Sequence, residues 1–133
     1  MGLGTGDADG DAGAHTRRVL VVDDEPMVAT AVAEYLDAVG DALDVVHTTA
    51  PTAALERLDG SFDWVVTDYE MPRLDGLALI ERAETDAEFV VFSGVDDDAV
   101  VRQARERGAT FVSKGVGTGP YDELATLVAG QER

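Results

Sequence analysis

Acidic side chains stand directly behind two short apolar runs of this sequence. Asp23 and Asp24 follow the run Val19–Val22, and Asp68 follows the run Trp64–Thr67. If the runs are parallel strands of one sheet, their carboxyl ends meet at one edge, and the three carboxylates lie together there. Two carboxylates about 4 Å apart repel by roughly 4 kcal/mol at an effective dielectric near 20, so such a group calls for a cation. Oxygen ligands without histidine or cysteine suit a hard ion, and we expect Mg²⁺.

Two further strand ends carry groups that can hold a phosphoryl group. Ser93 and Gly94 end the run Phe89–Phe92, and Lys114 ends the last apolar run. A carboxylate such as that of Asp68 can attack phosphorus and form an acyl phosphate. Because phosphoryl transfer needs mainly positioning and charge neutralisation, Mg²⁺, the Lys114 ammonium and the Ser93 hydroxyl with the following backbone amide can each take one phosphoryl oxygen. The pattern therefore predicts a phosphoryl-accepting site.

The elements that would position these groups alternate between apolar runs and segments of helical period. The predicted strands are Val19–Val22, Leu43–Thr48, Trp64–Thr67, Phe89–Phe92 and Thr110–Ser113. The predicted helices run from Pro26 to a stop at Gly40 and over Thr52–Leu58, Gly76–Glu84, Asp97–Arg107 and Tyr121–Ala129. Continuous apolar strands joined by helices predict an α/β fold, a flavodoxin-like (βα)5 doubly wound parallel sheet with strand order 2-1-3-4-5.

Some local features of these elements can also be predicted. Asp44 and His47 interrupt the second strand, so we place it at an edge of the sheet. The Asp96–Asp98 run is typical of the capped start of a helix. We interpret Met27, Tyr35 and Trp64 as packing residues. The buried face of the first helix is predicted to hold Val28, Val32, Tyr35, Leu36 and Val39.

Composition limits the classes of protein to which the chain can belong. It has 133 residues and a net charge of −17, which favours one domain and disfavours direct contact with nucleic acid or an anionic membrane. The absence of cysteine excludes disulfides and thiolate sites. The apolar runs are too short for a membrane span, and we expect a cytoplasmic protein. Residues 1–16 hold five glycines and three aspartates, which predicts a disordered acidic tail before a domain over residues 17–133.

Four stretches together resemble the receiver domain of two-component response regulators. They are VLVVDDE (Val19–Glu25), TDYEMPRLDGL (Thr67–Leu77), FSG (Phe92–Gly94) and FVSK (Phe111–Lys114). Their order and approximate spacing agree with the family from about Arg17 to Gly130. The resemblance implies that Asp68 is the phosphoacceptor and that Mg²⁺ is held by Asp23, Asp24, Asp68 and the backbone carbonyl of Glu70. It also implies phosphate-binding and switch roles for Ser93, Gly94, Phe111 and Lys114, with Ser93 and Phe111 as the switch pair and Lys114 as the phosphate-binding lysine.

One position departs from the family, and the departure resembles a variant of it. Gly115 stands where the family usually has proline after the lysine. The run KGVGTGPYDELA, which begins at Lys114, is similar to the ending of haloarchaeal receivers. Low lysine and high acidity point the same way, since hydrated carboxylates keep proteins soluble at high salt.

The resemblance implies a stand-alone receiver that accepts a phosphoryl group from a sensor histidine kinase or a phosphotransfer protein. It would signal to a downstream protein by conformational change, with no external substrate, so we do not expect an enzyme. One alternative is a haloacid-dehalogenase-type aspartyl phosphatase, although that family has aspartate two residues after its nucleophile, where Glu70 stands here. Another alternative is an interaction module that works without phosphorylation.

Overall fold

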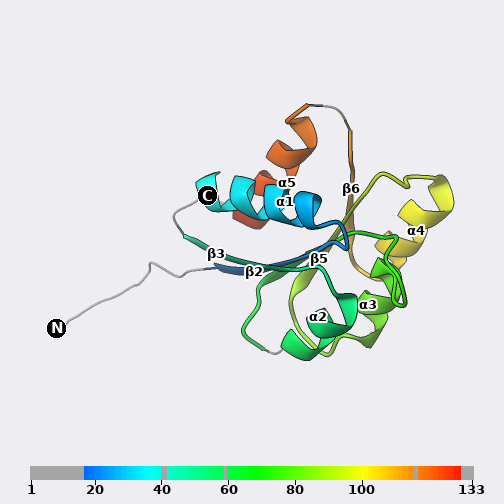
Figure 1. The fold of residues 1–133 in the computed structure, drawn as a ribbon. Helices are drawn as coiled ribbons and strands as arrows, with labels where there is room; N and C mark the ends of the chain where they lie inside the picture. Colours follow the sequence, from blue (N-terminus) through cyan, green and yellow to red (C-terminus); the bar gives the residue numbers. More distant parts are fainter. Residues whose placement is uncertain (1–16, 40–41, 59, 116, 130–133) are drawn as a thin grey trace.

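The computed structural model describes residues 17–39, 42–58, 60–115 and 117–129, so the predicted tail over residues 1–16 lies outside the described residues. Strands and helices alternate along the chain (Figure 1). The strands are β2 (Arg17–Val22), β3 (Leu43–Thr48), β4 (Trp64–Thr67), β5 (Glu88–Ser93) and β6 (Thr110–Ser113). The helices are α1 (Pro26–Val39), α2 (Pro51–Arg57), α3 (Gly76–Arg82), α4 (Asp98–Glu106) and α5 (Gly119–Ala129).

All strand pairs are parallel, and the sheet has the order β3-β2-β4-β5-β6. This is the predicted order 2-1-3-4-5, and the predicted edge strand is β3, where Asp44 forms an ion pair of 3.2 Å with Arg18 of β2. Helices α1 and α5 cover one face, and α2, α3 and α4 lie on the other (Figure 1). Among the described residues, no helix combines the length and apolarity that a membrane span needs.

The core is divided by the sheet into two layers. Val19 and Val21 of β2 face α1 and α5, whereas Leu20 and Val22 face the opposite layer. Successive strand residues point to opposite faces, so a sheet covered on both sides needs unbroken apolar strands. The predicted apolar runs are such strands.

Two predicted packing residues of α1 are exposed. The buried stripe runs through Ala29, Val32 and Leu36, whereas Met27 is 85% exposed and Val39 is 46% exposed. Met27 lies two residues before Ala29, which is about 200° around the helix and therefore on its outer side. Val39 is the last residue of α1, where the helix ends beside solvent.

A close backbone contact joins α3 to the end of β4. The Gly76 N–H donates to the Tyr69 carbonyl at 2.8 Å, and the Asp75 side chain caps α3 by accepting from the Ala78 N–H at 2.8 Å. A Cβ atom on Gly76 would lie 2.3 Å from the Asp68 carbonyl oxygen. Only glycine fits there, and its contact fixes the loop that follows Asp68.

We therefore expect Gly76→Ala to destabilise the protein by roughly 1–3 kcal/mol, because a backbone carbonyl cannot move aside at low cost. Gly60→Ala is the matched control, since nothing lies within 4 Å of a Cβ at Gly60. The free energy of unfolding in urea tests both variants. Equal stability of the two variants would contradict the contact.

Candidate functional site

The three predicted carboxylates meet at the carboxyl edge of the sheet. Val22 of β2 pairs with Thr67 of β4, so Asp23 and Asp68 follow neighbouring strands at the same level. The Asp68 N–H donates to the Val22 carbonyl at 2.9 Å and continues this pairing. One carboxylate oxygen from each of Asp23, Asp24 and Asp68 lies within 4.8 Å of the others. The sheet register therefore forces three acidic groups together.

Asp23 is the most buried of the three carboxylates, at 3% exposed. Its Oδ1 accepts a hydrogen bond of 3.0 Å from the Glu25 N–H. Its Oδ2 accepts one of 3.0 Å from Lys114 Nζ, whose side chain is a quarter exposed. A buried carboxylate needs such partners, because an unpaired charge is costly away from water.

The Lys114 side chain contacts the carboxylates that follow both β2 and β4. Its Nζ lies 3.7 Å from Asp68 Oδ1 in addition to its contact with Asp23. Its backbone N–H donates to the Ser93 carbonyl at 2.9 Å, which extends the β5–β6 pairing by one residue. This extension fixes where the lysine side chain leaves the sheet.

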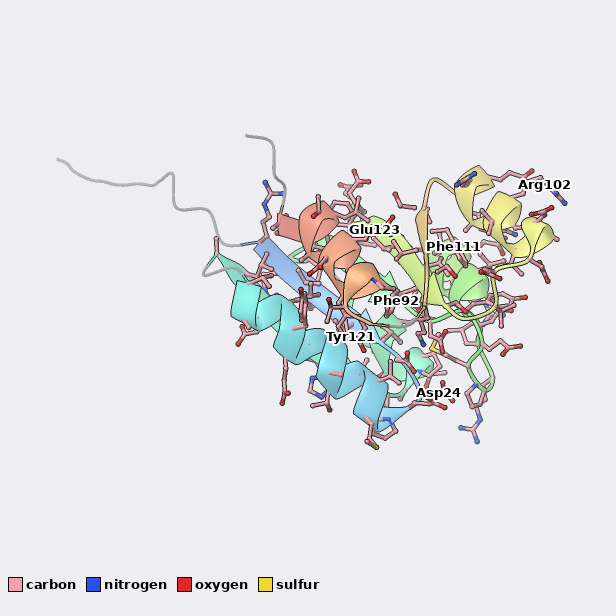
Figure 2. The ribbon with its side chains drawn as sticks, turned by 90° about the horizontal axis from the view of Figure 1, so that it is seen from above. Asp24, Phe92, Arg102, Phe111, Tyr121 and Glu123 are labelled. Carbon is pink, nitrogen blue, oxygen red and sulfur yellow. The ribbon has the colours of Figure 1, made fainter. Side chains whose placement is uncertain are left out.

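A pocket of about 410 Å³ opens over these groups. Its lining comprises Asp24, Glu25, Asp68, Glu70, Ser93, Gly94, Val95 and Lys114. Ser93 is buried, and its Oγ accepts from the Val95 N–H at 3.0 Å. Asp23 is buried below the pocket. Figure 2 shows Asp24 between the end of β2 and the start of α1.

Phe111 is the one predicted site residue that neither lines this pocket nor belongs to the carboxylate group of Asp23, Asp24 and Asp68. It is half-buried in β6 and packs against the core layer on the α4 side (Figure 2). The structure thus brings all the other predicted residues together and leaves Phe111 beside them.

Burial raises the pKa of the Asp68 carboxyl above its usual range, and the charge of Asp23 raises it further. The Lys114 ammonium, the Tyr69 N–H at 2.8 Å and the Ser93 hydroxyl act in the opposite direction but do not prevail. The loss of solvation on burial therefore outweighs the nearby positive charge and the two hydrogen bonds.

These groups fit a hard divalent cation. The candidate ligands are carboxylate oxygens of Asp23, Asp24 and Asp68, and Mg²⁺ and Ca²⁺ prefer such oxygens. Burial raises the pKa of Asp68, and a cation bound beside it would favour the ionised carboxylate that a ligand must supply.

Three neighbours of the site were not predicted as such. Gly76 makes room for the Asp68 carbonyl, the Thr67 hydroxyl donates to that carbonyl at 2.9 Å, and the Phe92 ring lies beside the Lys114 ammonium. Gly76 and Phe92 both belong to the stretches that resemble the receiver family. Their contacts, however, are visible only in the three-dimensional structure.

The fold and site define a flavodoxin-like α/β protein with an acidic, lysine-flanked pocket at the switch point of its sheet. Residues 19–124 match the response regulator receiver domain, and the chain belongs to this family. Receiver domains act as phosphoacceptors in two-component signalling and generally bind Mg²⁺ at an acidic pocket.

Relatives and solved structures agree with this assignment. The chain is 36% identical over 100 residues to protein-glutamate methylesterase/protein-glutamine glutaminase 1 of Anaeromyxobacter dehalogenans, covering 71% of this chain and 28% of that protein. It therefore spans less than a third of the length of that relative. The non-phosphorylated HemR receiver domain from Leptospira biflexa has a TM-score of 0.76 at 23% identity, covering 89% of this chain and 98% of that one. The receiver domain of Francisella response regulator 1452 has a TM-score of 0.73 at 22% identity, covering 86% and 94%.

We expect Asp68→Asn to raise the unfolding temperature of the metal-free protein at pH 7, because it removes an ionised carboxylate from an unfavourable place. A carboxyl whose pKa is higher in the folded chain than in the unfolded chain lowers stability as the pH rises between the two values. The gain should therefore shrink as the pH falls and vanish near pH 3 and below, where the carboxyl is largely neutral in both states.

Thermal unfolding followed by circular dichroism in EDTA, at both pH values, measures this effect. Asp37→Asn, at an exposed position of α1, is the control and should change little at either pH. A less stable Asp68→Asn protein at pH 7 would contradict the assigned balance of burial and charge.

Proposed function

We propose that this chain accepts a phosphoryl group on Asp68 from a sensor histidine kinase or a phosphotransfer protein. The observation that supports this most directly is the position of the Asp68 carboxylate in an open pocket, with Lys114 Nζ 3.7 Å from its Oδ1. A carboxylate that needs positive charge, and is accessible beside an ammonium, suits attack on an anionic phosphoryl group.

In the proposed transfer, a carboxylate oxygen of Asp68 forms a bond to phosphorus while the bond from phosphorus to the donor's imidazole nitrogen breaks. The bonding electron pair stays on that nitrogen, and no other group is consumed. Lys114 balances charge on one phosphoryl oxygen, and the Ser93 hydroxyl with a backbone N–H of the following loop binds another. Hydrolysis of the acyl phosphate by water returns the Asp68 carboxylate and inorganic phosphate.

In this proposal, Mg²⁺ would be held by Asp23, Asp24, Asp68 and the backbone carbonyl of Glu70. When bound, the ion supplies positive charge that the carboxylates and a phosphoryl oxygen can share. Asp23 is already fixed by the Glu25 N–H and by Lys114, so it is positioned before any ligand arrives.

The response to phosphorylation would begin at Ser93 and Phe111. The Ser93 Oγ accepts from the Val95 N–H at 3.0 Å, so a hydroxyl drawn to a phosphoryl oxygen would pull on the loop between β5 and α4. Phe111 lies on the α4 side of β6 and would repack as that loop moves. The altered surface would carry the signal to a downstream protein.

Acetyl [³²P]phosphate with Mg²⁺ should label the wild-type protein at Asp68, and Asp68→Asn should abolish the label because the nucleophile is lost. Asp37→Asn is the matched control and should label as the wild type does. The label should be acid-stable and base-labile, as an acyl phosphate is, and EDTA should suppress it.

Three results would contradict the proposal. Full labelling of Asp68→Asn would place the phosphoacceptor elsewhere. No labelling of the folded wild type by acetyl phosphate or by a kinase would favour an interaction module that works without phosphorylation. Turnover of a chromogenic phosphate ester would indicate a phosphatase, although family membership already argues against the dehalogenase alternative.

We also propose that the chain works in a cytoplasm of high ionic strength, as its haloarchaeal-like composition suggests. The support is compositional: a net charge of −17, and one lysine beside nine arginines. Self-repulsion of that size destabilises a small domain until salt screens it.

The unfolding temperature should therefore rise by roughly 5 °C or more between low and molar KCl. Differential scanning calorimetry across the salt series measures the rise. Sucrose at equal osmolality is the control, because it excludes itself from protein surfaces without screening charge. A flat salt profile would remove the argument for a high-salt environment.

A further inference from the structure

The ammonium of Lys114 lies against an aromatic ring as well as two carboxylates. Its Nζ is 5.5 Å from the centroid of the Phe92 ring, 3.0 Å from Asp23 Oδ2 and 3.7 Å from Asp68 Oδ1. Phe92 is 2% exposed. An ammonium within about 6 Å of a ring centroid can be attracted by the electrons of the ring face, and the attraction grows when water is excluded.

The strand register accounts for this contact. Phe92 of β5 pairs with Val112 of β6, and both belong to the core layer on the α1 and α5 side. Lys114 comes two residues after Val112, and residues two apart on an extended chain point to the same face. The lysine therefore leaves the sheet on the side where the Phe92 ring lies.

Tyr121 packs against the Phe92 ring, and Tyr35 in turn packs against Tyr121. The Tyr121 ring of α5 meets the Phe92 ring at 5.8 Å between centroids and 74° between planes, and Figure 2 shows these two residues close together. The Tyr35 ring of α1 meets Tyr121 at 5.4 Å and 80°, and its hydroxyl donates to Asp122 of α5. Edge-to-face pairs of this kind are favourable and directional, so they hold the Phe92 ring in one orientation.

We propose that Phe92 is a positioning residue for Lys114, with its ring braced by Tyr121 so that the ammonium stays within reach of Asp68. Asp23 alone would draw the ammonium toward the buried side, since it makes the shorter contact. The ring confines the ammonium on a third side and leaves it where an incoming phosphoryl oxygen can meet it. The expected effect of Phe92 on phosphorylation of Asp68 rests on the function proposed above. The contact between Phe92 and Lys114 does not depend on that function.

Lys114 is the single lysine of the 133-residue sequence, which makes the contact directly measurable. Protein labelled with ¹³C-lysine gives one Cε signal, and protons near a ring face are shifted upfield. We expect an upfield Lys114 Cε proton signal in the wild type that moves toward the value of an exposed lysine in Phe92→Leu. Phe89→Leu is the matched control, because Phe89 is a buried phenylalanine of the same strand on the opposite face. An unchanged signal in Phe92→Leu would overturn the proposal.

The rate of labelling by acetyl phosphate with Mg²⁺ tests whether the contact matters for the reaction. Phe92→Leu should label roughly threefold to tenfold more slowly than the wild type, and Phe89→Leu should stay within about twofold of it. An unchanged rate in Phe92→Leu would overturn the positioning role. Absence of label in the wild type would instead contradict the proposed function, while the Lys114 signal would still decide whether the contact exists.

A second pair of variants covers the case in which Phe92→Leu does not fold. Tyr121 is half-buried on α5. Tyr121→Leu therefore removes the ring that packs against Phe92 without replacing Phe92 itself. We expect a smaller upfield shift of the Lys114 signal and slower labelling in Tyr121→Leu, and restoration of both in Tyr121→Phe. Wild-type shift and rate in Tyr121→Leu would overturn the bracing role.

Discussion

Repulsion among the carboxylates at one edge of the sheet is the constraint on which the rest of the site depends. The parallel register of β2 and β4 brings Asp23 and Asp68 to the same level, and Asp24 adds a third charge. Water would normally weaken such repulsion, but Asp23 is buried and Asp68 largely so. The Lys114 ammonium relieves part of the repulsion, while burial still raises the pKa of the Asp68 carboxyl. The site is thus built to accept more positive charge.

Each surrounding contact limits how the site can relax. The Glu25 N–H holds Asp23, the Tyr69 N–H holds Asp68, and the close approach of Gly76 fixes the loop behind Asp68. Because these partners are backbone groups, the carboxylates cannot separate without distortion of the fold. The stability of the core therefore maintains an electrostatic arrangement that is unfavourable in itself. Functional sites commonly have this property.

Most of the fold could be predicted from the sequence, because a sheet covered on both faces requires unbroken apolar runs such as Val19–Val22. The strand order and the edge position of β3 followed from general rules of chain connection. Met27 was misplaced because an apolar residue beside a helical stripe looks like part of it until the neighbours are known. The strand ends indicated which groups would meet at the site. Contacts between distant segments, such as Phe92 with Lys114 or Gly76 with Asp68, depend on close packing that no local pattern encodes.

The charged edge strand β3 has a consequence for how the molecule behaves among its neighbours. An edge strand presents unpaired backbone groups to which a strand of another chain can add. Asp44 is exposed on β3 and paired with Arg18, and His47 is exposed on the same strand. An apolar strand that approached this edge would have to strip water from these charged and polar groups. The β3 edge of the sheet therefore resists the addition of an apolar strand from another chain.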